Sequence, residues 1–304
     1  MNVLIGLAAF AIGVAVLVES VEGLVKTLRA WAAAASVSGV FLAAIVLGFD
    51  LESTAAGVAA TLDDLPGTAL GTSIGAAIFL VTAGLGVAGL IAPFELRTPR
   101  PLLAAPGLAT VIAIILSADG ELTQVDGGML LASFAALVAL MLQARWADGD
   151  PERPPGKTYE HPWRRVLLGL AGLLVGAELL VFGTGRIVED IGISETIFGM
   201  LVVAAAVSLE EVILEALPAF RGFPELSVGN ALGTLTFLLT GSLGVIVLVR
   251  PIEVPATVVD YHLPALALTV LLAGAVLARG RLRRGEGGLL VGAYAVYAAG
   301  ALLV

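Results

Sequence analysis

Two long apolar segments of the chain contain acidic side chains, which are rare in such surroundings. The first segment carries Asp50 and Glu52 in the run GFDLES. The second carries Glu210 and Glu211 in the run VSLEE, and Glu215 follows one helical turn later. Ionisable groups inside a membrane are costly and are functional candidates by default. Neither run has a His or Lys nearby, so these carboxylates must either bind cations or carry protons.

Neutral oxygen-bearing side chains accompany the carboxylates. Ser53 and Ser208 stand beside them, and Thr72, Asn230 and Thr234 lie in the glycine-rich runs GTALGTSIGAAIF and GNALGTLTF. Hard cations such as Ca²⁺ bind about six to eight carboxylate, carbonyl and hydroxyl oxygens. Small residues also let helices pack closely, which explains the glycine-rich runs equally well. The candidate cation-binding residues are Glu52, Glu210, Glu211, Asp50, Ser53, Ser208, Thr234, Asn230 and Thr72.

The composition indicates a lipid environment. Of 304 residues, 59% are hydrophobic and only 13% are charged, whereas an average soluble domain carries about 25% charged residues. The absence of Cys excludes a disulfide framework and a thiolate metal site. A net charge of −9 argues against a nucleic-acid partner.

Ten apolar segments are long enough to cross a bilayer, which takes about 20 residues. They cover residues 2–25, 33–62, 68–92, 102–118, 127–146, 164–188, 195–219, 225–249, 262–279 and 287–303. With ten spans, every Lys and Arg except Arg186 and Arg250 falls on one side, which is then the cytoplasmic side. The sequence therefore predicts an all-α polytopic membrane protein with both termini outside.

An internal repeat divides the chain. Residues 51–95 align without a gap with residues 209–253, at a constant offset of 158 positions. The identical pairs include Glu52 with Glu210, Pro66 with Pro224, Gly75 with Gly233, Thr82 with Thr240 and Glu95 with Glu253. Apolar composition alone would not align Pro, Gly, Thr and Glu together.

The repeat predicts two inverted five-helix halves, residues 1–146 and residues 164–304. The Pro-rich, charged segment 147–163 connects them and is predicted to be a cytoplasmic linker. An odd number of spans in each half inserts the second copy upside down. Inverted repeats are typical of secondary transporters, which bind their ions near the membrane midplane.

At these residues the sequence resembles the Ca²⁺/cation antiporter superfamily, and within it the sodium/calcium exchanger family. The likeness is specific in AELLVFGTGRIVEDIGISETIFGMLVVAAAVSLEE, GFPELSVGNALGT and LVRPIEV. It implies ten helices in two inverted halves, with one α-repeat at about 40–95 and another at about 198–253. It also implies that the first and sixth helices slide across a fixed core formed by the second, third, seventh and eighth helices.

Carried over by position, the resemblance places the family's motif glutamate at Glu211, and the motif proline becomes Glu210. In the first half the same two positions are Ser53 and Glu52. Asn230 keeps the family's asparagine. The motif T-S pair becomes Phe49-Asp50 in the first half and Val207-Ser208 in the second. The other departures are Thr72 for the first-half asparagine, Ala76 and Thr234 for the motif serines, and Leu80 and Leu238 for a later polar position.

The resemblance implies a secondary active cation antiporter that exchanges Na⁺ and Ca²⁺ by alternating access. Such a protein needs no cofactor and is not an enzyme, and its partners are the lipid bilayer and inorganic cations, with no obligatory protein partner evident. One alternative is Ca²⁺/H⁺ or Na⁺/H⁺ exchange at the same carboxylates. An intramembrane enzyme is disfavoured because no span has a central His. A non-transporting membrane scaffold is the remaining alternative, favoured by Leu80 and Leu238.

The expected location is the cell membrane. Most other carboxylates fall in loops, and Arg far outnumbers Lys. Acidic loops with few Lys are expected of a chain that faces concentrated salt, so a halophilic source is a hypothesis.

Overall fold

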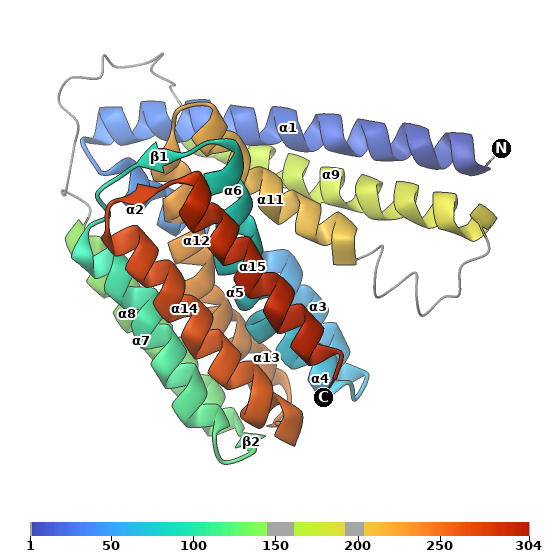
Figure 1. Ribbon diagram of the computed structural model, residues 1–304, viewed down its shortest axis with the longest axis vertical. Helices are drawn as coiled ribbons and strands as arrows, with labels where there is room; N and C mark the ends of the chain where they lie inside the picture. Colours follow the sequence, from blue (N-terminus) through green and yellow to red (C-terminus); the bar gives the residue numbers. More distant parts are fainter. Residues whose placement is uncertain (1, 145–160, 192–203, 304) are drawn as a thin grey trace.

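The computed structural model describes the backbone of residues 2–144, 161–191 and 204–303, most of which is helical (Figure 1). The first half contains α1 (Asn2–Ala35), α2 (Gly39–Val46), α3 (Leu51–Leu62), α4 (Pro66–Leu70), η1 (Gly71–Gly75), α5 (Ala76–Phe79), η2 (Leu80–Gly84), α6 (Leu85–Ile91), β1 (Phe94–Glu95), α7 (Arg100–Ser117), β2 (Glu121–Leu122), α8 (Gln124–Met141) and η3 (Leu142–Ala144). The second half contains α9 (Pro162–Ile191), α11 (Ala204–Phe220), α12 (Pro224–Thr236), η5 (Phe237–Ser242), α13 (Leu243–Val249), β3 (Ile252–Glu253), η6 (Val258–His262), α14 (Leu263–Ala278), β4 (Arg281–Leu282) and α15 (Arg284–Ala301). Most of the predicted linker 147–163 lies outside the described residues.

Eight helical stretches in the described ranges are long and apolar enough to cross a membrane. They correspond to eight of the predicted spans, with Arg100–Ser117 at 102–118 and Pro224–Val249 at 225–249. Of the other two predicted spans, 195–219 is described only from Ala204 onward, as α11, and 287–303 forms α15. The all-α membrane class is therefore confirmed.

The predicted span 33–62 contains a break that the sequence analysis missed. Helix α2 ends at Val46, and α3 begins only at Leu51. Asp50 is the N-cap of α3, because its Oδ1 accepts a hydrogen bond of 2.8 Å from the backbone N–H of Ser53. Asp is among the preferred N-cap residues. The break places Asp50 and Glu52 at the start of a helix inside the apolar segment.

Helices α1 and α9 form an antiparallel pair that lies at a large angle to the remaining bundle (Figure 1). Helix α1 has 34 residues, which at about 1.5 Å per residue is roughly 50 Å. A helix much longer than the ~30 Å apolar layer accommodates the mismatch by tilting. The two helices approach closely, since a Cβ added to Gly13 of α1 would lie 2.9 Å from the carbonyl oxygen of Gly176 in α9.

Two continuous helices form the centre of the bundle. Pro224–Val249 is 83% buried along its apolar window and Pro66–Ile91 is 67% buried, against 39% or less for the other candidate spans. Both contain π-helical turns, and η2 in the first matches η5 in the second at the repeat offset. Such turns are rare in proteins overall, and those that occur are often found at functional sites.

Two short strand pairs join the halves of the chain. Strand β1 pairs antiparallel with β4, and β2 pairs antiparallel with β3. The repeat offset places β3 at the position of β1, so the first strand after each repeated helix pairs with a strand of the other half. The sequence analysis did not predict these pairings, because two-residue strands carry no periodic signal.

Helix α2 packs directly on α12, and Gly229 permits this contact. A Cβ added to Gly229 would collide with the carbonyl oxygen of Val40 and would lie 2.7 Å from Cβ of Ala43. We expect Gly229→Ala to destabilise the protein by about 1–3 kcal/mol, the usual cost of overpacking. The measurement is thermal unfolding of the purified protein in detergent. Gly274→Ala in α14 is the control, because a Cβ at Gly274 meets nothing within 4 Å. Equal melting temperatures for the two variants would contradict this packing.

Candidate cation site

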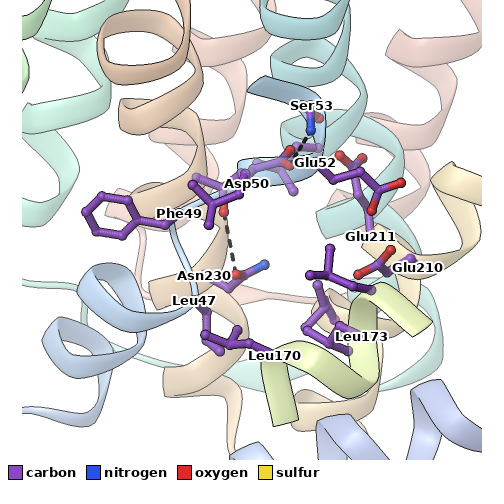
Figure 2. Close-up of a pocket in the computed structure, with 15 residues that line it drawn as sticks. Leu47, Phe49, Asp50, Glu52, Ser53, Leu170, Leu173, Glu210, Glu211 and Asn230 are labelled. Carbon is purple, nitrogen blue, oxygen red and sulfur yellow. Dashed lines mark hydrogen bonds between the residues drawn. The ribbon is translucent and has the colours of Figure 1, made fainter. Parts of the chain in front are cut away.

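A cavity of about 120 Å³ lies between the α2–α3 break, α9, α11 and α12. Four carboxylates line it: Asp50 and Glu52 from the start of α3, and Glu210 and Glu211 from α11 (Figure 2). Most of the remaining wall is apolar, with leucines such as Leu80, Leu170 and Leu173. Among the described residues, no Lys, Arg or His lines the cavity. The structure therefore brings the acidic residues of the two repeats into one place.

The start of α3 is held in position by hydrogen bonds. Asp50 caps the helix through Oδ1, which accepts from the backbone N–H of Ser53. The hydroxyl of Thr54 lies 2.8 Å from the carbonyl oxygen of Asp50 and 2.9 Å from the hydroxyl of Ser242 in η5. The break is thus tied to the π-helical turn of the central helix, and this contact fixes the backbone that presents Asp50 and Glu52.

The carboxyl groups of Glu52, Glu210 and Glu211 lie on the same side of the cavity (Figure 2). Those of Glu52 and Glu210 are close enough to share a hydrogen bond. Two carboxylates at this separation repel each other unless a proton or a cation lies between them. In their present rotamers, no three of the described acidic side chains lie close enough together to coordinate one metal ion. Side-chain rotation would be needed to enclose one.

Three neutral candidates also line the cavity. Ser53 lies beside Asp50, and Asn230 and Thr234 extend from α12, where they are 3% and 5% exposed. The hydroxyl of Thr234 is 3.5 Å from Oδ1 of Asn230. These side chains add neutral oxygens to the acidic set, as a site for a hard cation requires.

Two further candidates have other placements. Thr72, the repeat counterpart of Asn230, is not among the residues that line the cavity, and its hydroxyl donates to the carbonyl oxygen of Ala69 at 2.8 Å. Ser208 belongs to α11, but its side chain lies outside the described residues. The two repeats therefore contribute different neutral groups in the described part of the site.

The sequence analysis missed some of the cavity lining. Leu170, Leu173 and Leu174 of α9 contribute to the wall, and no local motif distinguishes them from leucines that face lipid. Leu174 also lines a second, more open cavity of about 380 Å³, together with Glu178. Glu178 thus lies next to the acidic cavity rather than in it.

Comparison with known proteins gives a family match over nearly the whole chain and relatives that match parts of it. The profile of the family described as sodium/calcium exchanger protein matches residues 5–143 and 161–303. The putative antiporter CaxA of Alkalimonas amylolytica is 28% identical over 252 residues, which is 76% of this chain and 77% of that protein. The inner membrane protein YrbG of Escherichia coli is 35% identical over 122 residues, covering 40% of this chain and 38% of YrbG.

The fold also matches a solved structure. The sodium-calcium exchanger NCX_Mj, soaked with zero Na⁺ and Ca²⁺, superposes with a TM-score of 0.85 at 24% sequence identity. The alignment covers 98% of this chain and 99% of that one. This likeness establishes a shared fold over the full length.

Proposed function

The chain belongs to the sodium/calcium exchanger protein family, and from this premise we propose that it is a secondary active antiporter of Na⁺ and Ca²⁺. The observation that carries the proposal is the cavity in which Asp50, Glu52, Glu210 and Glu211 meet without a cationic side chain in the described residues. An acidic, largely apolar cavity among membrane helices is stable only when protons or cations neutralise it.

The proposed ligands are the four carboxylates together with the oxygens of Ser53, Asn230 and Thr234. Ca²⁺ accepts this mixture of charged and neutral oxygens. Na⁺ competes for the same oxygens, so the release of one ion is coupled to the binding of the other. No covalent step, cofactor or ATP is required. Ser208 and Thr72 stay predictions as ligands.

We also propose ten spans in two inverted halves, with both termini outside. The strand pairs support this arrangement, because β1–β4 and β2–β3 each join loops that the charge distribution assigns to the same side. The matching positions of η2 and η5 support it as well. Alternating access would then follow from movement of the α1–α9 pair across the central helices.

Proton coupling is the second candidate. The contact between the carboxyl groups of Glu52 and Glu210 favours it, since such a pair can hold one proton in place of a metal ion. In that case the protein would exchange Ca²⁺ or Na⁺ for H⁺ through the same cavity.

Flux measurements on reconstituted vesicles separate these candidates. Vesicles loaded with Na⁺ and diluted into Na⁺-free medium should take up ⁴⁵Ca²⁺, whereas vesicles without an ion gradient should not. An imposed pH gradient, applied in the absence of Na⁺, should then drive little uptake. Uptake driven only by the pH gradient would favour proton coupling, and no uptake under either gradient would rule out Ca²⁺ transport.

The acidic loops make salt dependence a further expectation. The excess negative charge, −9 in total, repels itself most strongly at low ionic strength, where salt screens the repulsion less and it acts over a longer distance. We propose a source that lives in concentrated salt, and we expect the melting temperature of the purified protein to fall as NaCl is diluted. Choline chloride should restore stability as NaCl does if screening is the cause. Full stability at low ionic strength would contradict the proposal.

A further inference from the structure

We propose that Glu215 is a positioning residue of the cation site, and that its carboxylate orients the side-chain amide of Asn230 so that the amide oxygen is available to the cavity. The inference rests on the proposed function, in which Asn230 is a neutral ligand. Glu215 itself does not line the cavity. It lies one helical turn beyond Glu211 on α11 and is 0% exposed.

Both carboxylate oxygens of Glu215 face polar groups of α12. Nδ2 of Asn230 donates to Oε1 at 2.8 Å. The hydroxyl of Ser227 lies 3.4 Å from Oε2 and also donates to the backbone carbonyl of Glu215. A buried carboxylate needs such donors, and no ion pair involving Glu215 occurs among the described residues. Glu215 therefore links α11 to the helix that carries Asn230 and Thr234.

The chemistry of the two side chains fixes the amide. Oε1 of Glu215 accepts the hydrogen bond, and only the NH₂ end of the Asn230 amide can donate one, so this contact fixes which way the amide is turned. The oxygen of that amide is then the atom left for the cavity, where the hydroxyl of Thr234 lies 3.5 Å from it. Without Glu215, the Asn230 amide could turn its NH₂ group toward the cavity. The partial positive charge of that group would repel a bound cation.

The first repeat has no equivalent of this arrangement. At the repeat offset, Gly57 stands where Glu215 is, and Thr72 stands where Asn230 is. A Cβ added to Gly57 would lie 2.6 Å from the hydroxyl oxygen of Thr72, so no acidic side chain could be placed there without displacing Thr72. The acid–amide pair is thus a feature of the second repeat alone.

A glycine on the central helix of the first half leaves room for the Glu215 side chain. Gly84 of η2 faces it, and a Cβ added to Gly84 would lie 3.3 Å from Cγ of Glu215. The repeat counterpart of Gly84 is Ser242, whose hydroxyl contacts Thr54 instead. At the equivalent position of the first repeat, Gly84 has no hydroxyl and instead leaves room for Glu215, which bonds to Asn230.

Na⁺-driven ⁴⁵Ca²⁺ uptake by reconstituted variants tests the inference. Glu215→Gln keeps an acceptor for Nδ2 of Asn230 and should leave the Ca²⁺ KM nearly unchanged. Glu215→Leu removes that acceptor, so the Asn230 amide is no longer held with its oxygen toward the cation. We expect the Ca²⁺ KM to rise about tenfold, the usual effect of losing one hydrogen-bonded ligand. Asn230→Asp with Glu215 present should also raise KM, because it replaces a donor with a second carboxylate.

The decisive variant is the combination of Glu215→Leu with Asn230→Asp. An Asp presents an oxygen to the cavity whichever way it turns, so the double variant should have a lower KM than Glu215→Leu alone. A purely structural role would lower Vmax and the melting temperature of Glu215→Leu without this rescue. An unchanged KM in Glu215→Leu, or a double variant no better than the single one, would overturn the inference.

A second measurement separates this inference from the proposed function. Stabilisation of the purified protein against heat by Ca²⁺ or Na⁺ should show the same pattern across the four variants. If the wild-type protein transports Ca²⁺ but the pattern is absent, only the role of Glu215 is wrong. If neither ion is transported or stabilises the wild-type protein, the proposed function fails, and the positioning role fails with it.

Discussion

Replacement of Glu211 with Gln is expected to reduce Na⁺-driven Ca²⁺ uptake by at least tenfold. Gln preserves the size and hydrogen-bonding capacity of the side chain but removes one charge from the cavity. Interactions with a charged ligand are worth about 1.5–3 kcal/mol, which corresponds to roughly a tenfold to a hundredfold change in binding. Glu211 lines the cavity, so we expect the loss of its charge to weaken cation binding.

Initial uptake rates over a range of Ca²⁺ concentrations, normalised to the amount of reconstituted protein, measure this effect. Glu121→Gln is a matched control, because Glu121 is exposed in β2 and far along the chain from the cavity elements. It should transport at the wild-type rate. Normal uptake by Glu211→Gln would remove this residue from the site while leaving the fold unaffected.

The contact between Glu52 and Glu210 predicts a change in pH dependence. In the wild-type protein, protons compete with Ca²⁺ for the carboxylates, so the Ca²⁺ KM should rise as the pH falls. Glu52→Gln should weaken Ca²⁺ transport about tenfold at neutral pH, since one charged ligand is lost. It should also flatten the dependence of KM on pH, because the pair that holds a proton no longer exists.

The same measurement on Glu210→Gln should give the same flattening, because the two carboxyl groups act as a pair. The double variant should then show no further loss of pH dependence. If each single variant keeps the wild-type pH profile, the two carboxylates titrate independently, and their contact has no role in transport.

Hydropathy predicted the positions of most helices, because lipid exposure imposes long apolar runs bounded by Pro, Gly and charge. The helix that begins at Pro224 starts within one residue of its predicted start at 225. The break before Asp50 was not predicted, although Gly48 and a good N-cap residue precede α3. Apolar residues continue through the break, so hydropathy alone cannot detect it. Hydropathy likewise gives no indication of the π-helical turns.

The acidic part of the candidate site could be predicted because a carboxylate inside a span is conspicuous. Neutral residues were harder to place. Thr72 and Asn230 occupy the same repeat position, yet the Thr72 hydroxyl bonds to its own helix, as Thr hydroxyls commonly do. The sequence shows that Glu215 is acidic but does not assign it to the site, because its link to Asn230 depends on how α11 packs on α12.

Equilibrium binding of ⁴⁵Ca²⁺ to the purified protein tests most directly the claim that the cavity carboxylates hold the exchanged cation. We predict saturable binding that Na⁺ displaces competitively and that the double variant Glu210→Gln/Glu211→Gln abolishes while its melting profile stays cooperative. Saturable binding that is insensitive to Na⁺, or that survives both substitutions, would contradict the account.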